Sequence, residues 1–168
     1  SRLLAFTRRA LAKTPSAPLA LAPMHKVAPP VISARFDAVI AQGRIVIAKP
    51  ELKNFHKLRI QFKRLRYAAE FVSSAYGDAL HAFIGEAVKI QDCLGDLQDT
   101  VFTRSLIDRL FREWKGSILA PRLIFMMGEM YELQREIARA KQTEFQEIWK
   151  RFDQETTRKT LASALRRD

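Results

Sequence analysis

The stretch FHKLRIQFKRLRYAAEF, residues 55–71, combines dense positive charge with a regular apolar pattern. Six of the sixteen residues from Leu52 to Tyr67 are Lys or Arg, and no acidic residue lies between Glu51 and Glu70. Its apolar residues recur at spacings of three and four, which is typical of a packed helix. Because solvated helix faces usually mix charges of both signs, the stretch predicts a packed helix with a functional positive face.

The basic residues of this helix form a stripe. At about 100° per residue, His56, Arg59, Lys63 and Arg66 lie within an arc of roughly 80° and extend over about 15 Å. Arginine can direct two hydrogen bonds to phosphate oxygens, whereas lysine acts as a point charge. One set of apolar residues flanks the stripe on each side. We therefore expect neighbouring helices to cover both sides, so that the cations line a groove. These apolar groups are Leu58, Phe62, Leu65 and Val72, and Ile60, Tyr67 and Phe71.

Length and composition favour one globular domain with a polyanionic partner. The chain has 168 residues, of which 48% are hydrophobic, and a formal charge of +11. Such a charge points to nucleic acid, polyphosphate or an anionic surface. The single cysteine, Cys93, excludes an internal disulfide and favours a reducing compartment, so we expect a cytoplasmic protein. No apolar run approaches the roughly 20 residues of a membrane span.

Glycine and proline divide the chain into segments. Residues 1–13 are expected to form a short helix, and residues 14–29 a loop rich in proline and alanine. Residues 30–156 are expected to form a helical bundle, and residues 157–168 a basic tail. Within the bundle we expect helices over about 30–47, from Pro50 to Gly77, over 79–113 and over 121–154.

The fold class that follows is all-α, an antiparallel four-helix bundle of long helices. The last helix carries apolar residues at spacings of three and four, which we interpret as core. They are Leu123, Met126, Met127, Met130, Leu133 and Ile137, followed by Phe145, Ile148, Trp149 and Phe152.

Three aspartates in QDCLGDLQD share one helix face, because Asp92, Asp96 and Asp99 stand at i, i+4 and i+7. A carboxylate-bridged metal site in a bundle would need glutamates and Glu-x-x-His motifs on several helices. Those motifs are absent from the sequence, so we expect no metal and no cofactor. We instead expect the aspartates to hold the neighbouring arginines in place. Gly95 in the same helix predicts the close approach of another helix.

These two motifs together resemble the second half of a CHAD domain, the conserved-histidine α-helical domain. His56, Arg59, Lys63, Arg64, Arg66 and Tyr67 match its basic motif, and Leu94, Gly95 and Asp99 match its second motif. The resemblance covers about residues 28–113. It implies two four-helix bundles related by a pseudo-twofold axis, which bind inorganic polyphosphate in a basic cavity. The resemblance implies that Arg64 also binds polyphosphate, together with His56, Arg59, Lys63 and Arg66. It implies that Tyr67, like the three aspartates, holds the binding residues in place.

This chain carries one copy of the basic motif, so it resembles the C-terminal half of such a domain, with residues 1–13 as a remnant of the first half. We therefore expect either a homodimer or a missing N-terminal half-domain to cover the apolar residues beside the stripe. A homodimer would bring two stripes toward one shared cavity.

Two other functions remain open from the residues alone. The first is nucleic-acid binding, which the net charge allows although no zinc, RNP or basic-zipper signature is present. The second is a histidine phosphotransfer bundle with His56 as the phosphate acceptor. We expect no enzyme, because the sequence has no Gly-rich phosphate loop, no nucleophile–base pair and no metal set.

Overall fold

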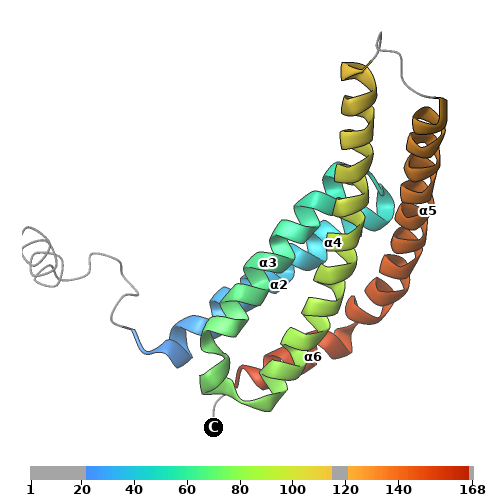
Figure 1. Ribbon diagram of the computed structural model, residues 1–168. Helices are drawn as coiled ribbons and strands as arrows, with labels where there is room; N and C mark the ends of the chain where they lie inside the picture. Colours follow the sequence, from blue (N-terminus) through green and yellow to red (C-terminus); the bar gives the residue numbers. More distant parts are fainter. Residues whose placement is uncertain (1–21, 115–120, 167–168) are drawn as a thin grey trace, which may run out of the picture.

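The computed structural model describes residues 22–114 and 121–166, and these residues form five helices and no strands (Figure 1). Consecutive long helices run in opposite directions, so the predicted all-α antiparallel bundle is confirmed. The helices are α2 (Met24–Ala48), α3 (Leu52–Tyr76), α4 (Asp78–Glu113), α5 (Pro121–Phe152) and α6 (Glu155–Ala164). The expected helix over residues 1–13 lies outside the described residues.

One face of α3 anchors the core. Leu58, Phe62 and Leu65 have no exposed surface, and burying each such side chain stabilises the fold by about 1.5–3 kcal/mol. Phe152, the last residue of α5, joins three helices at this face. Its ring centroid lies 5.3 Å from that of Phe62 on α3 and 5.8 Å from that of Phe36 on α2. The apolar spacing of the sequence therefore identified the buried face of α3 correctly.

The helices begin and end near the glycine and proline residues that the sequence analysis used as boundaries. Gly77 stands alone between α3 and α4 with a φ of 69°, a left-handed conformation that glycine adopts at little cost. Asp78 is the first residue of α4, where its negative charge suits the helix N-terminus. Pro121 begins α5, where a missing N–H leaves no helical hydrogen bond unmade.

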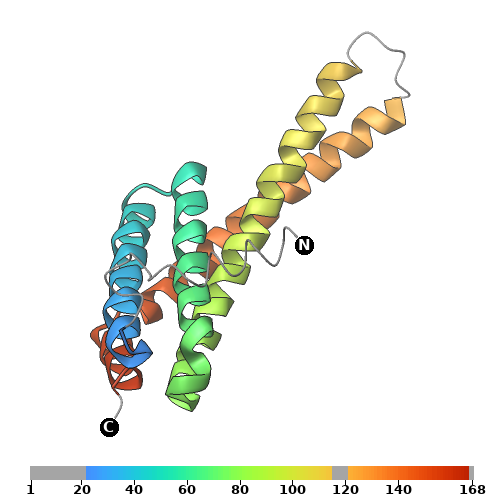
Figure 2. The ribbon, with the colours of Figure 1, turned by 90° about the vertical axis from the view of Figure 1, so that its left-hand side faces the viewer.

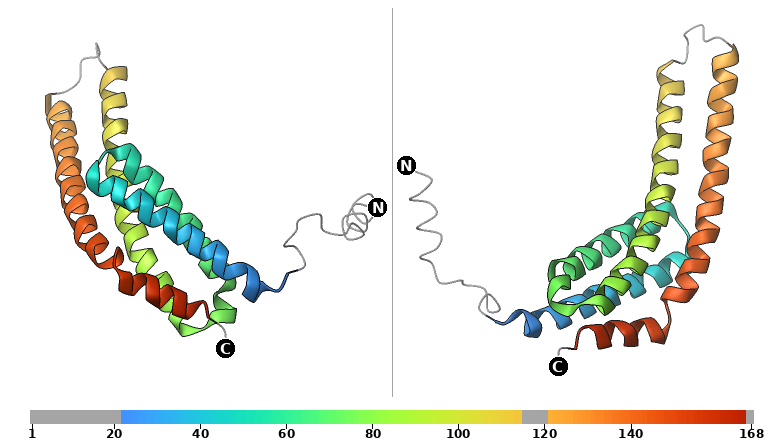
Figure 3. Two further views of the ribbon diagram at one scale, coloured as in Figure 1. Left: turned by 180° about the vertical axis from the view of Figure 1, so that it is seen from behind. Right: turned by 60° about the horizontal axis from the view of Figure 1, so that its bottom comes forward.

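The predictions of a loop over residues 14–29 and of a tail over residues 157–168 were both wrong in part. Residues 24–29, assigned to the loop, belong to α2, although Pro29 and Pro30 lie inside that helix. Burial of Ala28 and Ile32 against the core compensates for the hydrogen bonds that the prolines cannot donate. Most of the predicted tail is α6, which buries Leu161 and Ala164 and packs against α4 (Figure 3).

The outer halves of α4 and α5 extend beyond α2 and α3 as a two-helix arm, defined here as residues 100–114 and 121–138 (Figures 1 and 2). The interpretation of the α5 apolar residues as core is confirmed for Phe145, Trp149 and Phe152, which are buried. It is wrong for four residues of the arm, which no described part of the chain covers, whereas Met127 and Ile137 are half-buried. Leu123, Met126, Met130 and Leu133 are exposed by 37–53%.

Gly43 of α2 allows the closest packing in the bundle. A Cβ at this position would overlap the ring of Trp149, which is buried on α5. We therefore expect Gly43→Ala to lower the free energy of unfolding by about 1–3 kcal/mol, the usual cost of overpacking. Urea unfolding followed by circular dichroism measures this change.

Gly85 of α4 provides the matched control, because a Cβ there meets no atom within 4 Å. Gly85→Ala should raise the free energy of unfolding by about 0.5–1 kcal/mol through helix propensity alone. Equal effects of the two substitutions would show that Trp149 does not pack on Gly43.

Candidate functional site

The cations of α3 lie along its edge with α4. Burial of Leu58, Phe62 and Leu65 fixes the rotation of α3 about its axis. Arg59, Lys63 and Arg66 are consequently half-buried at the border between the core and the solvent. His56 is exposed at the same edge, one turn nearer the start of the helix. We call these four residues the stripe, and the structure brings all four together on one side of α3, as the spacing predicted.

The face of α4 opposite the stripe is neutral. His56 Nδ1 lies 3.1 Å from Gln98 Oε1. One turn further along, Arg59 Nε lies 4.0 Å from the position that a Cβ of Gly95 would occupy. The same antiparallel register places Gln91 opposite Lys63. Gln91, Gly95 and Gln98 thus line this edge without a negative charge.

Gly95 has a different role from the one expected. A Cβ there would make only ordinary contact with Arg59, so close approach of the two helices does not require the glycine. Its missing side chain leaves room beside the Arg59 guanidinium.

Some hydrogen-bond donors of the stripe have no partner among the described residues. The Nε atoms of Arg59 and Arg66 are buried without a hydrogen-bond partner among the described residues, and so is Gln91 Oε1. Arg66 Nε lies 2.9 Å from Glu70 Oε1, an ion-pair contact without hydrogen-bond geometry. His56, Arg59 and Lys63 make no ion pair within residues 22–114 and 121–166. Unpaired donors at a packed edge are available to an anion.

Tyr67 and Arg64 occupy the outer surface of α3. Arg66 Cζ lies 5.3 Å from the centroid of the Tyr67 ring, a cation–π contact that restricts the guanidinium. Arg64 is exposed and lies about 140–160° around the helix from Arg59 and Arg66. A ligand that contacts the stripe therefore reaches Arg64 only by wrapping over the outer surface.

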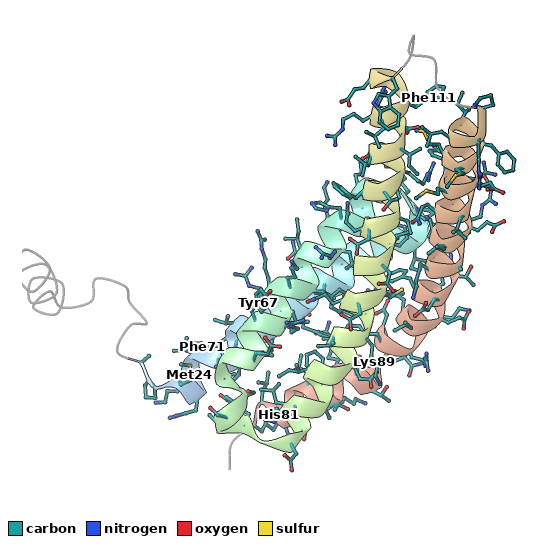
Figure 4. The ribbon with its side chains drawn as sticks, in the orientation of Figure 1. Met24, Tyr67, Phe71, His81, Lys89 and Phe111 are labelled. Atoms are coloured by element: carbon teal, nitrogen blue, oxygen red, sulfur yellow. The ribbon has the colours of Figure 1, made fainter. Side chains whose placement is uncertain are left out.

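The expectation that both apolar groups flanking the stripe would be covered was wrong. Tyr67 is 53% exposed and Phe71 76% exposed, and both lie on the outer surface of α3 (Figure 4). Alpha-helical geometry places them on the side opposite the core-facing residues. The stripe is consequently bordered by α4 on one side and is open on the other. The predicted groove would need a further surface to close it.

The predicted role of the aspartates was wrong for Asp96. Its carboxylate lies 2.9 Å from Lys141 Nζ on α5, not beside an arginine of α3. Glu144 contacts the same ammonium at 2.8 Å, and the two carboxylates raise the pKa of Lys141. Asp92 lines a cavity on this side of α4. Asp99 is exposed and makes no ion pair with any described residue.

The α4 residues predicted to meet the stripe are each offset by one position from those that do. The aspartates at 92, 96 and 99 do share a face, but Asp96 on that face meets Lys141 of α5 and not an arginine of α3. The preceding residues, Gln91, Gly95 and Gln98, share the face that meets α3. Their identical i, i+4, i+7 spacing was the available signal. A helix turns by about 100° per residue, so a shift of one position changes the neighbour.

A cavity of about 790 Å³ lies between α4, α5 and α6. Its charged lining mixes both signs, with Glu86, Asp92 and Glu144 beside Lys89 and Arg151. Lys89 already pairs with Glu86 at 2.6 Å. This composition is less suited than the stripe to a polyanion.

Three further findings complete the description of the site's surroundings. Burial raises the pKa of the Cys93 thiol at the floor of this cavity to about 11, so the thiol is protonated and unreactive near neutral pH. No group of three His, Cys, Asp or Glu side chains is arranged to hold a metal ion in the part of the chain that the structure describes. Among the same residues, no helix is both long enough and apolar enough to cross a membrane.

Comparison with known proteins agrees with the motifs. No curated protein and no solved structure matches the chain. The sequence model of the CHAD domain matches residues 1–108, which is more than half of the chain and includes α2, α3 and most of α4. The matched region contains both the stripe and the neutral face of α4. The chain therefore belongs to the CHAD domain family.

Proposed function

We propose that this protein binds inorganic polyphosphate along the stripe. The observation that carries the proposal is the pairing of four closely spaced basic residues with a face of α4 that has two glutamines and a glycine in place of acids. An ordinary surface helix would neutralise such charges with carboxylates across the edge. Here the positive potential is left for a ligand.

The arrangement suits a chain of phosphates better than a single small anion. Successive cations are separated by about one helical turn, roughly 5 Å along the axis, so they can meet successive phosphates of an extended polymer. Arg59 and Arg66 can each direct two N–H donors to phosphate oxygens. Because α3 is held by its buried face, the protein loses little conformational freedom on binding.

Nucleic-acid binding is the main alternative, because a phosphate backbone would also be attracted to the stripe. The CHAD family resemblance favours polyphosphate, as does the lack of a zinc, RNP or basic-zipper signature in the sequence. Phosphotransfer through His56 is the second alternative, and its ring is exposed. We further propose a cytoplasmic location, because the only cysteine is a free, buried thiol.

Removal of the stripe should abolish most binding. We expect the combined variant Arg59→Ala, Lys63→Ala and Arg66→Ala to weaken polyphosphate binding at least about 100-fold, since hydrogen bonds to charged groups contribute about 1.5–3 kcal/mol each. Fluorescence anisotropy with labelled long-chain polyphosphate measures the loss. Arg64→Ala alone should cost less than Arg59→Ala alone.

The combined variant Arg35→Ala, Arg139→Ala and Lys159→Ala is matched in charge and serves as the control. These three residues are exposed on α2, α5 and α6. It should bind within a fewfold of the unaltered protein at physiological salt, where distant surface charges are screened. Helical circular dichroism must be unchanged in both variants. Equal losses would mean diffuse attraction by net charge and would refute a site on α3.

Ligand choice separates the proposal from its main alternative. We expect tighter binding to long-chain polyphosphate than to duplex DNA of equal charge, and a steeper dependence on salt than for ATP or pyrophosphate. Each neutralised phosphate releases counterions, so an extended contact steepens the slope. Titrations at several salt concentrations measure both quantities. Tighter binding to DNA would favour the nucleic-acid function instead.

A further inference from the structure

One side of the arm carries six apolar side chains, which we call the arm face. Its residues are Phe102 and Leu106 of α4 and Leu123, Met126, Met130 and Leu133 of α5. Phe102 is 65% exposed and Met130 is 50% exposed. The α5 members recur at alternating spacings of three and four, the seven-residue pattern of a helix that packs along a straight seam.

The arm face is a second seam, separate from the one that joins the arm together. The side of α5 that faces α4 carries Tyr131 and Ala138, and Tyr131 accepts a hydrogen bond of 2.9 Å from Arg104 of α4. Met130 and the other α5 residues of the arm face lie about 100° around α5 from that side. The α5 helix thus has two adjacent apolar seams, as in bundles of more than two helices, and α4 covers only one of them.

Both helices contribute to the same side of the arm. On α4, Phe102 and Leu106 lie about 100–160° around the helix from Thr100 and Ile107, which face α5. The rotation is in the sense opposite to the helix turn. The seam on α5 is rotated in the same sense about its own axis. Because the two helices are antiparallel, these rotations bring both sets of side chains to one surface.

The arm face is large for a surface left in water. At roughly 200 Å² for each large apolar side chain, its six residues expose on the order of 500 Å², near the upper limit for a monomer. Two such faces pressed together would bury on the order of 1,000 Å², the size at which specific interfaces begin.

The charge of the arm favours a copy of the same chain as the partner. Its described residues contain five basic and five acidic side chains, although the whole chain has a net charge of +11. Two copies can therefore meet through their arms without the repulsion that would oppose contact between their stripes. In a dimer with twofold symmetry, the arm face of one copy packs on the identical arm face of the other.

We propose that the arm face is the contact surface of a homodimer, in which two arms pack into a four-helix bundle. Methionine side chains at the centre of the face can adapt to one another in such a seam. This interface leaves the stripe, Tyr67 and Phe71 open to a ligand. It does not depend on polyphosphate, in contrast to the homodimer expected from the sequence, in which two stripes face one cavity.

Sedimentation velocity of the full chain tests the interface. We expect the unaltered protein to be a dimer at micromolar concentration, and to remain one in 0.5 M NaCl without any polyanion, because burial of apolar surface is not screened by salt. The double variant Met126→Glu and Met130→Glu should be monomeric, with at least a tenfold weaker dimer affinity and unchanged helical circular dichroism. Its polyphosphate affinity per chain should not change for short ligands.

Two control variants locate the contact. Phe125→Glu alters an exposed residue of the same helix, but on the opposite side of the arm, and should remain dimeric. Tyr67→Ser with Phe71→Ser tests the outer surface of α3 and should also remain dimeric. A monomeric wild-type protein would overturn the proposal. So would a dimer that survives the two glutamates, or one that only the α3 variant separates.

Discussion

The burial of one face of α3 against the aromatic cluster around Phe152 determines the rest of the structure. Phe152 contacts Phe36, Phe62 and Phe83, and so joins α2, α3 and α4 at one point. Because Leu58, Phe62 and Leu65 point into the core, helical geometry places the stripe at the edge between α3 and α4. Phe152 follows the residues that match the CHAD family, so the last helices complete a core that the matched region begins.

The rotation of α4 is fixed in the same way and has an electrostatic consequence. Its apolar residues, including Leu94 and Leu97, point into the core. Gln91, Gly95 and Gln98 then meet the stripe, while Asp96 turns to Lys141. Carboxylates on the first of these faces would have neutralised the stripe. Their placement on the second face stabilises the contact with α5 and leaves His56, Arg59 and Lys63 without an ion pair among the described residues.

The sequence predicted helices and faces well, but it predicted the neighbours of those faces poorly. Gly77 and Pro121 gave the boundaries of three helices to within about two residues, and the spacing of three and four identified the buried side of α3. Periodicity shows which residues share a face, but not which helix covers that face. For this reason Asp96 was assigned to the wrong partner, Met130 was interpreted as core, and Phe71 was expected to be covered. The helix α6 was missed because its ten residues contain few apolar side chains.

In the proposed function, the neutral face of α4 leaves the stripe free for a polyanion. The polyphosphate affinity of the Gln98→Glu variant measures this, because the nearly isosteric change places a carboxylate beside His56. The control is Gln146→Glu, the same change on the exposed surface of α5. We expect Gln98→Glu to weaken binding roughly tenfold through repulsion and internal ion pairing, and Gln146→Glu to have little effect. Equal affinities of the two variants would contradict the account.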